Sequence, residues 1–226
     1  LHDALPISLP EADFKTIYDA WIEHEVLVFH DQDISVDQQI AFGQRFGELT
    51  IHPFSPNMDD RREVIVLDNH NANPPALTDQ WHSDETFRAE PPTGTILRSE
   101  ISPAVGGDTL FSSMTAAFAG LSPRMQNYLS GLTAVHDFKP FRTLFANRPE
   151  KKAQLRKMED DYPNPSHPVV RRHPVSGRPI LNVNPQFTTR INDLPADESD
   201  MLLNFLYSQA KKPEYQLRRS EERRVG

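Results

Sequence analysis

The stretch WHSDETF, at positions 81–87, places an imidazole and a carboxylate two residues apart. If this segment is an extended strand, His82 and Asp84 project to the same side and can converge on one ion. A neutral imidazole and a hard carboxylate, without sulfur, belong to the set of two histidines and one carboxylate that holds Fe(II). The pattern therefore raises the question of where a third ligand would come from.

The triplet by itself is weak support for a metal site. Because the chain of 226 residues has 9 histidines and 32 acidic residues, about one His-x-acid triplet is expected by chance. An exposed loop histidine that pairs with Asp84 or Glu85 explains the same residues. From the triplet alone, this simpler interpretation is favoured.

Composition narrows the class of protein. The sequence has no cysteine, which excludes disulfides, zinc–thiolate sites and a thiol nucleophile and leaves His, Asp and Glu as metal ligands. The net charge of −8 argues against a nucleic-acid partner, because affinity for phosphate backbones comes from clustered Lys and Arg. No run approaches the roughly 20 apolar residues that a membrane span needs. We therefore expect a cytoplasmic globular protein that binds neither nucleic acid nor membrane.

Hydrophobic periodicity predicts helices near the N-terminus and short strands after them. Capping boxes, Ser8 with Glu11 and Ser35 with Gln38, mark the starts of two helices. Further helices are expected from residue 122 onward, at 148–161 and at 195–212. Strands are expected at 26–30, 63–68, 94–101, 108–113, 132–138, 167–174 and 179–184. Strands separated by irregular loops favour a single domain, mainly β with α insertions, built as an antiparallel sandwich or roll.

A much longer pattern surrounds the triplet. The stretch WHSDETFRAEPPTGTILRSEISPAVGGDTLFSS (81–113) resembles the core signature of the taurine dioxygenase family of Fe(II)- and 2-oxoglutarate-dependent oxygenases. Other stretches resemble the family in the same order, at 30–49, 65–75, 131–138, 167–191 and 212–218. The resemblance covers about residues 9–218. It implies a double-stranded β-helix, the jelly-roll fold of these oxygenases, incomplete at the C-terminus.

The resemblance also implies roles for individual residues. His82 and Asp84 fall on the first two iron ligands, and Thr109 in GGDT falls on the residue that holds the far carboxylate of 2-oxoglutarate. Three further positions correspond to the substrate pocket of the family: His52, Thr78 and Phe187.

Simpler interpretations stay open for these positions. GGDT can be a hairpin turn between 94–101 and 108–113 in which two glycines supply positive φ. His52 can be a solvated loop histidine, and Phe187 can be a core phenylalanine.

The chemistry implied by the resemblance needs Fe(II), 2-oxoglutarate as cosubstrate and O2. Such an enzyme couples the decarboxylation of 2-oxoglutarate to succinate and CO2 with hydroxylation of a C–H bond in a small substrate. Ser55 replaces a tyrosine, and Thr78 an asparagine, of the taurine pattern, so polar contacts to a sulfonate head are altered. We therefore expect a small anionic substrate, with a sulfonate, a sulfate ester and a carboxylate all open.

Two other functions fit the same residues. The first is a metal-dependent hydrolase that uses His82, Asp84 and a third ligand from His136, His167 or His173 around an activated water. The second is a non-enzymatic roll that binds small anions through His52 and the GGDT turn. Formation of a homo-oligomer stays open in each case.

The ends of the chain bear on the third ligand. In the family the second histidine follows the counterpart of KPEYQLR, which here ends at Arg218, and the remaining residues resemble no family segment. We expect residues 1–8 and 219–226 to be non-native and the third ligand histidine to be absent from this chain. As written, the polypeptide is then expected to bind Fe(II) weakly, to be inactive and to aggregate through unpaired strand edges.

Overall fold

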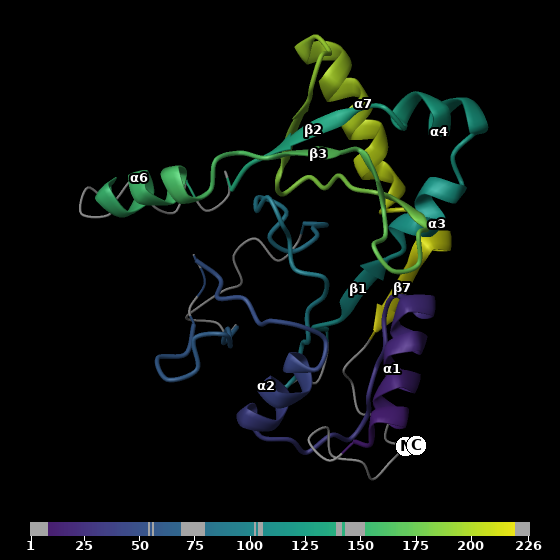
Figure 1. The fold of residues 1–226 in the computed structure, drawn as a ribbon. Coiled ribbons are helices and arrows are strands. Elements are labelled where there is room, and N and C mark those ends of the chain that lie inside the picture. Colours follow the sequence, from purple (N-terminus) through teal and green to yellow (C-terminus); the bar gives the residue numbers. More distant parts are fainter. Residues whose placement is uncertain are drawn as a thin grey trace. The chain divides into compact units, whose positions relative to one another are not determined.

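The computed structural model describes residues 9–53, 55, 57–68, 80–101, 103, 106–138, 142 and 152–219. Its helices and strands are labelled in Figure 1, and they fall into two compact units. The first unit comprises Leu1–Pro75 and Gly94–Leu97, and the second comprises Ala76–Thr93 and Arg98–Gly226. The single catalytic domain expected over residues 9–218 stays a prediction. No helix within these described ranges is long and apolar enough to cross a membrane.

Two helices, α1 (Glu11–His24) and α2 (Val36–Gln44), form the first unit around an aromatic core. Phe14 and Ile17 on α1 and Phe42 on α2 are buried together, and the rings of Phe14 and Phe46 lie 5.0 Å apart between centroids. Helix α1 begins after Pro10, which provides no side-chain cap, so the predicted capping box at Ser8 was wrong.

The start of α2 follows the sequence prediction closely. The side chain of Ser35 accepts a hydrogen bond from the backbone N–H of Gln38 at 3.2 Å. The Gln38 side chain in turn accepts one from the backbone N–H of Ser35 at 2.7 Å. The predicted capping box is confirmed, since both of its reciprocal bonds are present.

Three predicted strands do not form in the described chain. Residues 26–30 and 94–101 have no strand, and 63–68 contributes only an isolated bridge between Asn57 and Ile65. Apolar runs become strands only where a second backbone pairs with them, and these runs leave large side chains exposed, such as Leu67 at 63% and Leu97 at 65%. Apolar composition alone therefore misled the prediction there.

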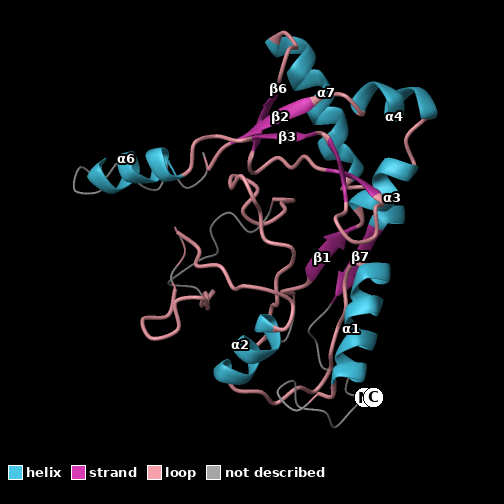
Figure 2. Ribbon diagram, in the orientation of Figure 1, coloured by secondary structure: helices cyan, strands magenta, loops and turns pink. Residues whose placement is uncertain are grey.

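Three small antiparallel sheets form the second unit (Figure 2). One sheet has the order β3 (Ser166–Pro168), β2 (Thr133–His136) and β6 (Thr188–Ile191). The other two are the pairs β4 (Val170–Arg172) with β5 (Pro179–Leu181), and β1 (Thr109–Ser112) with β7 (Gln216–Arg219). The predicted strands at 108–113, 132–138 and 179–184 are confirmed. The single strand predicted at 167–174 divides into β3 and β4, which belong to different sheets, and β6 and β7 were not predicted.

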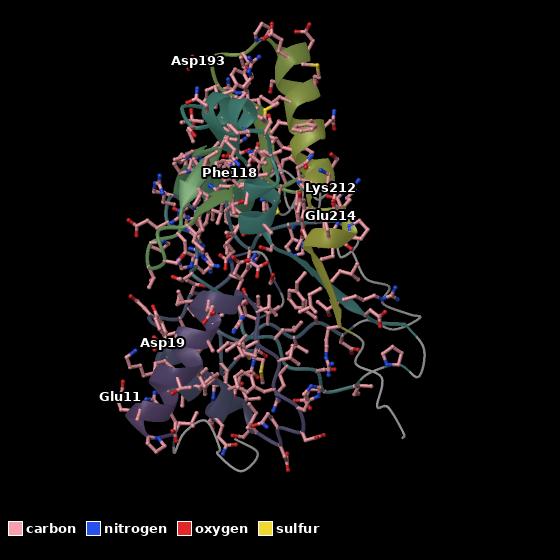
Figure 3. All side chains as sticks on the ribbon, turned by 90° about the vertical axis from the view of Figure 1, so that its right-hand side faces the viewer. Glu11, Asp19, Phe118, Asp193, Lys212 and Glu214 are labelled. Atoms are coloured by element: carbon pink, nitrogen blue, oxygen red, sulfur yellow. The ribbon has the colours of Figure 1, made fainter. Side chains whose placement is uncertain are left out.

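Helices of the second unit lie between and beside these strands: α3 (Met114–Ala119), α4 (Pro123–Leu129), α6 (Lys152–Asp161), α7 (Ala196–Gln209) and the 3-10 helix η3 (Pro213–Tyr215). Figure 3 places Asp193 at the turn before α7, and Lys212 and Glu214 after it. The antiparallel sheets and helical insertions agree with the coarse form of the predicted fold.

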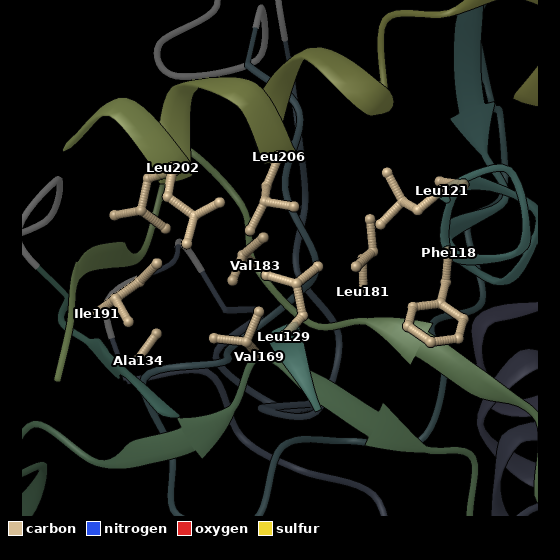
Figure 4. Packing of buried hydrophobic residues seen from close by; sticks show 12 residues of the cluster. Phe118, Leu121, Leu129, Ala134, Val169, Leu181, Val183, Ile191, Leu202 and Leu206 are labelled. Atoms are coloured by element: carbon tan, nitrogen blue, oxygen red, sulfur yellow. The ribbon is translucent and has the colours of Figure 1, made fainter. Parts of the chain in front are cut away.

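The core of the second unit lies between α7 and the strands (Figure 4). Leu206 on α7 and Leu129 on α4 are fully buried, as is Val169 between β3 and β4. Ser199 connects the start of α7 to β6, because its hydroxyl accepts a hydrogen bond from the backbone N–H of Ile191 at 2.8 Å. This core supports the sheet β3-β2-β6, from which two buried histidines reach the segment that follows His82.

Candidate metal site

His82 and Asp84 converge in the second unit. The Nε2 atom of His82 lies 3.4 Å from Oδ1 of Asp84, and the two side chains are 39% and 46% exposed. On the other side of the ring, Nδ1 of His82 lies 2.8 Å from the backbone carbonyl of Gln80. Because a carbonyl only accepts, Nδ1 carries the proton in that bond, and the Nε2 lone pair of the neutral ring faces Asp84.

A turn, not a strand, brings the two side chains together. Residues 81–83 are irregular and Asp84 opens a turn that runs to Phe87, so the predicted extended segment was wrong. Glu85 has a φ of 50°, in the left-handed region that few non-glycine residues adopt. The turn closes through the Arg88 N–H, which donates to the Glu85 carbonyl at 2.9 Å, and through an ion pair between the same two side chains.

The electrostatics at the pair are those of an imidazole beside a carboxylate. The hydrogen bond to Asp84 is the largest of the causes that raise the pKa of His82 above its usual value, and partial burial opposes it. In the protonated ring, a proton occupies the space between Nε2 and Oδ1. A divalent cation between the two atoms would take the place of that proton.

The donor set suits a transition metal in part. One imidazole nitrogen and one carboxylate oxygen face each other, and the second ring nitrogen is held by a backbone carbonyl, as is usual for histidine ligands. Among the residues that the structure describes, no group of three His, Cys, Asp or Glu could hold a metal ion. His82 and Asp84 therefore fit two positions of a facial triad, and the absence of the third ligand from the whole chain stays a prediction.

Three other histidines have structural partners instead. In the buried interior, Nε2 of His167 lies 3.0 Å from the Thr86 carbonyl and 2.9 Å from the Arg88 carbonyl. Nδ1 of His136 lies 2.9 Å from the hydroxyl of Thr86. Nδ1 of His173 accepts the backbone N–H groups of two residues in the following turn. None of the three joins His82 and Asp84 in a cluster of three ligands within the described ranges.

Thr109 is the first residue of β1 and is half-buried. Gly106 and Gly107 precede it with φ values of 81° and 76°, as predicted for the GGDT turn. The turn does not close a hairpin, because β1 pairs with β7, where Thr109 lies opposite Arg219. The hairpin between 94–101 and 108–113 was therefore wrong, and the role of Thr109 toward 2-oxoglutarate stays a prediction.

Phe187 lies in an aromatic cluster next to the candidate ligands. Its ring centroid is 5.4 Å from that of Phe87, which follows Asp84 by three residues, and both rings are almost completely buried. Phe87 also packs edge-on against Phe138 and Tyr162. The cluster thus buries Phe87, the last residue of the turn at 84–87, against three aromatic rings, and a contact between Phe187 and substrate stays a prediction.

The structure does not place the two other predicted substrate residues, His52 and Thr78, beside His82 and Asp84. His52 belongs to the first unit, where it is half-buried and its carbonyl accepts the side-chain amide of Asn57 at 2.8 Å. Thr78 falls outside the described residues. Roles for both in substrate binding therefore stay predictions.

Sequence reasoning missed the polar residues that hold the turn. Thr86 is 2% exposed, and its hydroxyl accepts a hydrogen bond from the side-chain amide of Asn184 at 3.2 Å in addition to its contact with His136. These residues are separated by 50 and 98 positions along the chain, so no local pattern connects them. The signal in the sequence was limited to the strand predicted at 132–138, which contains His136.

Comparisons with known proteins place the chain in a family. The family model described as "Taurine catabolism dioxygenase TauD, TfdA family" matches residues 3–220. An alpha-ketoglutarate-dependent dioxygenase, cnsP, from Penicillium expansum is 34% identical over 208 residues, which are 85% of this chain and 54% of that protein. An alpha-ketoglutarate-dependent sulfate ester dioxygenase from Pseudomonas putida is 32% identical over 202 residues, 88% of this chain and 66% of that protein.

A solved structure gives the same assignment. The crystal structure of a taurine dioxygenase from Burkholderia xenovorans superposes with a TM-score of 0.77 at 29% identity, over 95% of this chain and 70% of that one. The chain spans about half the length of the first curated relatives that it matches. It belongs to the TauD/TfdA family, as the family model and the relatives together show.

Proposed function

We propose that the protein to which this chain belongs is an Fe(II)- and 2-oxoglutarate-dependent dioxygenase that hydroxylates a small anionic substrate. The observation that carries the proposal is the 3.4 Å approach of His82 Nε2 to Asp84 Oδ1, inside a chain that the family model matches over residues 3–220. An imidazole and a carboxylate are two of the three ligands that such an iron site requires.

The residues of this chain have separate tasks in the proposed reaction. His82 and Asp84 hold the iron, which, when bound, activates O2 for attack on a C–H bond and takes 2-oxoglutarate as cosubstrate. The Gln80 carbonyl fixes the tautomer of His82, so that Nε2 is the atom offered to the metal. Thr109 offers a hydroxyl to the far carboxylate of 2-oxoglutarate, and the buried rings of Phe87 and Phe187 keep water from one side of the site.

The substrate class follows from the relatives and from the proposed pocket residues. One matched relative is named as a sulfate ester dioxygenase and another as a sulfonate dioxygenase, which supports an anionic head group on a small molecule. His52 and Thr78 are the proposed contacts to that head group. A sulfonate, a sulfate ester and a carboxylate all remain candidates for that head group.

For the fold, we propose the double-stranded β-helix of the family. The antiparallel pairing of all three small sheets supports it, as does the TM-score of 0.77 to a taurine dioxygenase. In this arrangement β1 and β7 are neighbouring strands of the roll, and further strands would continue it.

A metal titration tests the site on this chain directly. Mn(II), which does not react with O2 as Fe(II) does, is added while amide resonances are followed by NMR, with His82→Ala as the disrupted variant. His173→Ala is the matched control, because it removes a histidine of the same unit that is not a proposed ligand. We expect paramagnetic broadening centred on residues 80–88 in the wild type and the control, and its loss in His82→Ala. Broadening that is unchanged in His82→Ala would contradict the proposed site.

Turnover is tested on a longer chain. The 226 residues are expected to form no succinate, whereas the same residues extended by the remaining C-terminal segment of a relative should do so with Fe(II), 2-oxoglutarate and an alkyl sulfate or sulfonate. Succinate production by the 226-residue polypeptide itself would show that the third ligand lies within it. The hydrolase alternative predicts turnover with Zn(II) and without 2-oxoglutarate, and no observation favours it, because His136, His167 and His173 have other partners.

A further inference from the structure

A buried polar network lies directly behind the proposed ligands. It connects Thr86, two residues after Asp84, to His167 on β3, to His136 on β2 and to Asn184 before β6. All four side chains are at most 7% exposed. Buried polar groups are costly unless they are bonded, so a network of this kind specifies one geometry for the backbone that it contacts.

The direction of each hydrogen bond can be assigned. Nε2 of His167 faces two carbonyls, those of Thr86 and Arg88, and therefore carries the proton and donates to both. The Asn184 amide donates to the Thr86 hydroxyl, and its carbonyl oxygen accepts the Phe187 N–H at 2.8 Å. The Thr86 hydroxyl proton is then available for Nδ1 of His136.

The neutral state of His136 agrees with this assignment. Burial, helped by the neighbouring His167, lowers the pKa of His136 to about 3, so its ring is uncharged near neutral pH and can accept at Nδ1. The two imidazole rings stand nearly perpendicular, with centroids 4.9 Å apart. Two strands of one sheet thus clamp the same threonine, through its hydroxyl and its carbonyl.

The clamped turn holds an unfavourable backbone conformation. Glu85, between Asp84 and Thr86, has a φ of 50° and is 7% exposed. A left-handed non-glycine residue persists only where the surrounding structure enforces it. Here the enforcing contacts on its C-terminal side are those of His136, His167 and Asn184 with Thr86, together with the His167 bond to the Arg88 carbonyl.

We infer that His136, His167 and Thr86 are positioning residues for the metal site, which hold the turn so that the Asp84 carboxylate faces His82 before any metal binds. The inference rests on the proposed function of His82 and Asp84 as ligands. It adds that the sheet β3-β2-β6, which supplies no ligand among the described residues, determines the affinity of the site.

The test compares two deletions of a buried hydroxyl. Thr86→Val removes the hydroxyl and keeps the shape of the side chain, and Thr86→Ser restores it. Ser199→Ala is the matched control, because Ser199 is also 2% exposed and its hydroxyl also makes a buried hydrogen bond in the second unit, at 2.8 Å. The Kd for Mn(II) alone and the free energy of unfolding in urea are measured for each.

We expect Thr86→Val to raise the Kd for Mn(II) about fivefold or more, since removal of one buried hydrogen-bonding group has effects of about that size. Ser199→Ala should lose similar stability with an unchanged Kd, and Thr86→Ser should bind Mn(II) as the wild type does. An unchanged Kd in Thr86→Val, or an equal rise in Thr86→Val and Ser199→Ala, would overturn the inference. Failure of the wild-type chain to bind Mn(II) near His82 even when extended as in the turnover test would refute the proposed function, and the inference with it.

A measurement without metal keeps the inference testable if Thr86→Val does not fold. Long-range proton–nitrogen NMR spectra of the wild-type chain, recorded at alkaline pH where imidazoles are neutral, report the tautomer of each histidine. A turn held in place requires His82 to be protonated at Nδ1, where it donates to Gln80. A mixture of tautomers at His82, as in a free imidazole, would show that the turn does not position the ring.

Discussion

Replacement of His136 by glutamine should reduce the acid sensitivity of the second unit. His136 is completely buried, and its pKa is lowered from 6.5 to about 3 by burial and by the neighbouring His167. The unfolded chain therefore binds a proton at pH values where the folded chain does not. Stability from this residue is complete above pH 6.5 and falls as the pH drops from 6.5 toward 3.

The magnitude follows from the two pKa values. Each pH unit within that window costs at most about 1.4 kcal/mol, so the 1.5 units from pH 6.5 to about pH 5 should cost the wild type about 2 kcal/mol more than His136→Gln. The amide of glutamine can still bond to the Thr86 hydroxyl, which limits other damage.

Urea unfolding at about pH 7 and about pH 5, followed by the NMR amide peaks of β2 and β6, measures the difference. The comparison uses the change in free energy between the two pH values within each chain, so that a constant cost of the substitution drops out. The same pH dependence in wild type and His136→Gln would refute the reasoning, because it would mean that the ring is not held neutral by its surroundings.

Three further outcomes are expected. Thr109→Val should weaken 2-oxoglutarate binding to the Mn(II)-loaded protein about tenfold, because it removes one hydrogen bond to a charged group. Equal affinity of wild type and variant in calorimetry would mean that the GGDT segment forms a turn without binding the cosubstrate. His52→Ala should raise the KM for the organic substrate in the extended chain and leave the KM for 2-oxoglutarate unchanged. The opposite pattern in succinate assays would contradict the assignment of His52 to the substrate pocket. Leu206→Ala should lower the free energy of unfolding by about 2–5 kcal/mol, because Leu206, on α7, is fully buried. A smaller loss in thermal or urea unfolding would show that the cavity left by the substitution collapses readily.

The sequence predicted those parts of the fold that local chemistry decides. The capping box of Ser35 with Gln38, the helix that begins at Ser122, and the positive φ at Gly106 and Gly107 depend on residues within three positions of one another. Such interactions leave a readable pattern, because the chain makes them with its immediate neighbours. Their confirmation shows that local signals were sufficient there.

Pairing between distant segments could not be predicted in the same way. Residues 26–30 have the apolar composition of a strand but form none in the described chain, whereas β7, with two arginines in its four residues, pairs with β1. The candidate site shows the same division. The spacing drew attention to His82 and Asp84 and the family resemblance proposed them as ligands, but the contacts of Thr86 in the following turn are with His136, His167 and Asn184, which are at least 50 positions away from it.

The pairing of β1 with β7 affects the order in which the strand pairs of the protein can form during synthesis. Asp108, beside Thr109, forms an ion pair with Arg218, which is 110 residues further along the chain. A ribosome needs roughly 5–20 s to add a segment of that length, and during that time β1 has no strand beside it. The strand pair that carries the proposed contact to 2-oxoglutarate therefore forms only after all three strands of the sheet β3-β2-β6 have been made.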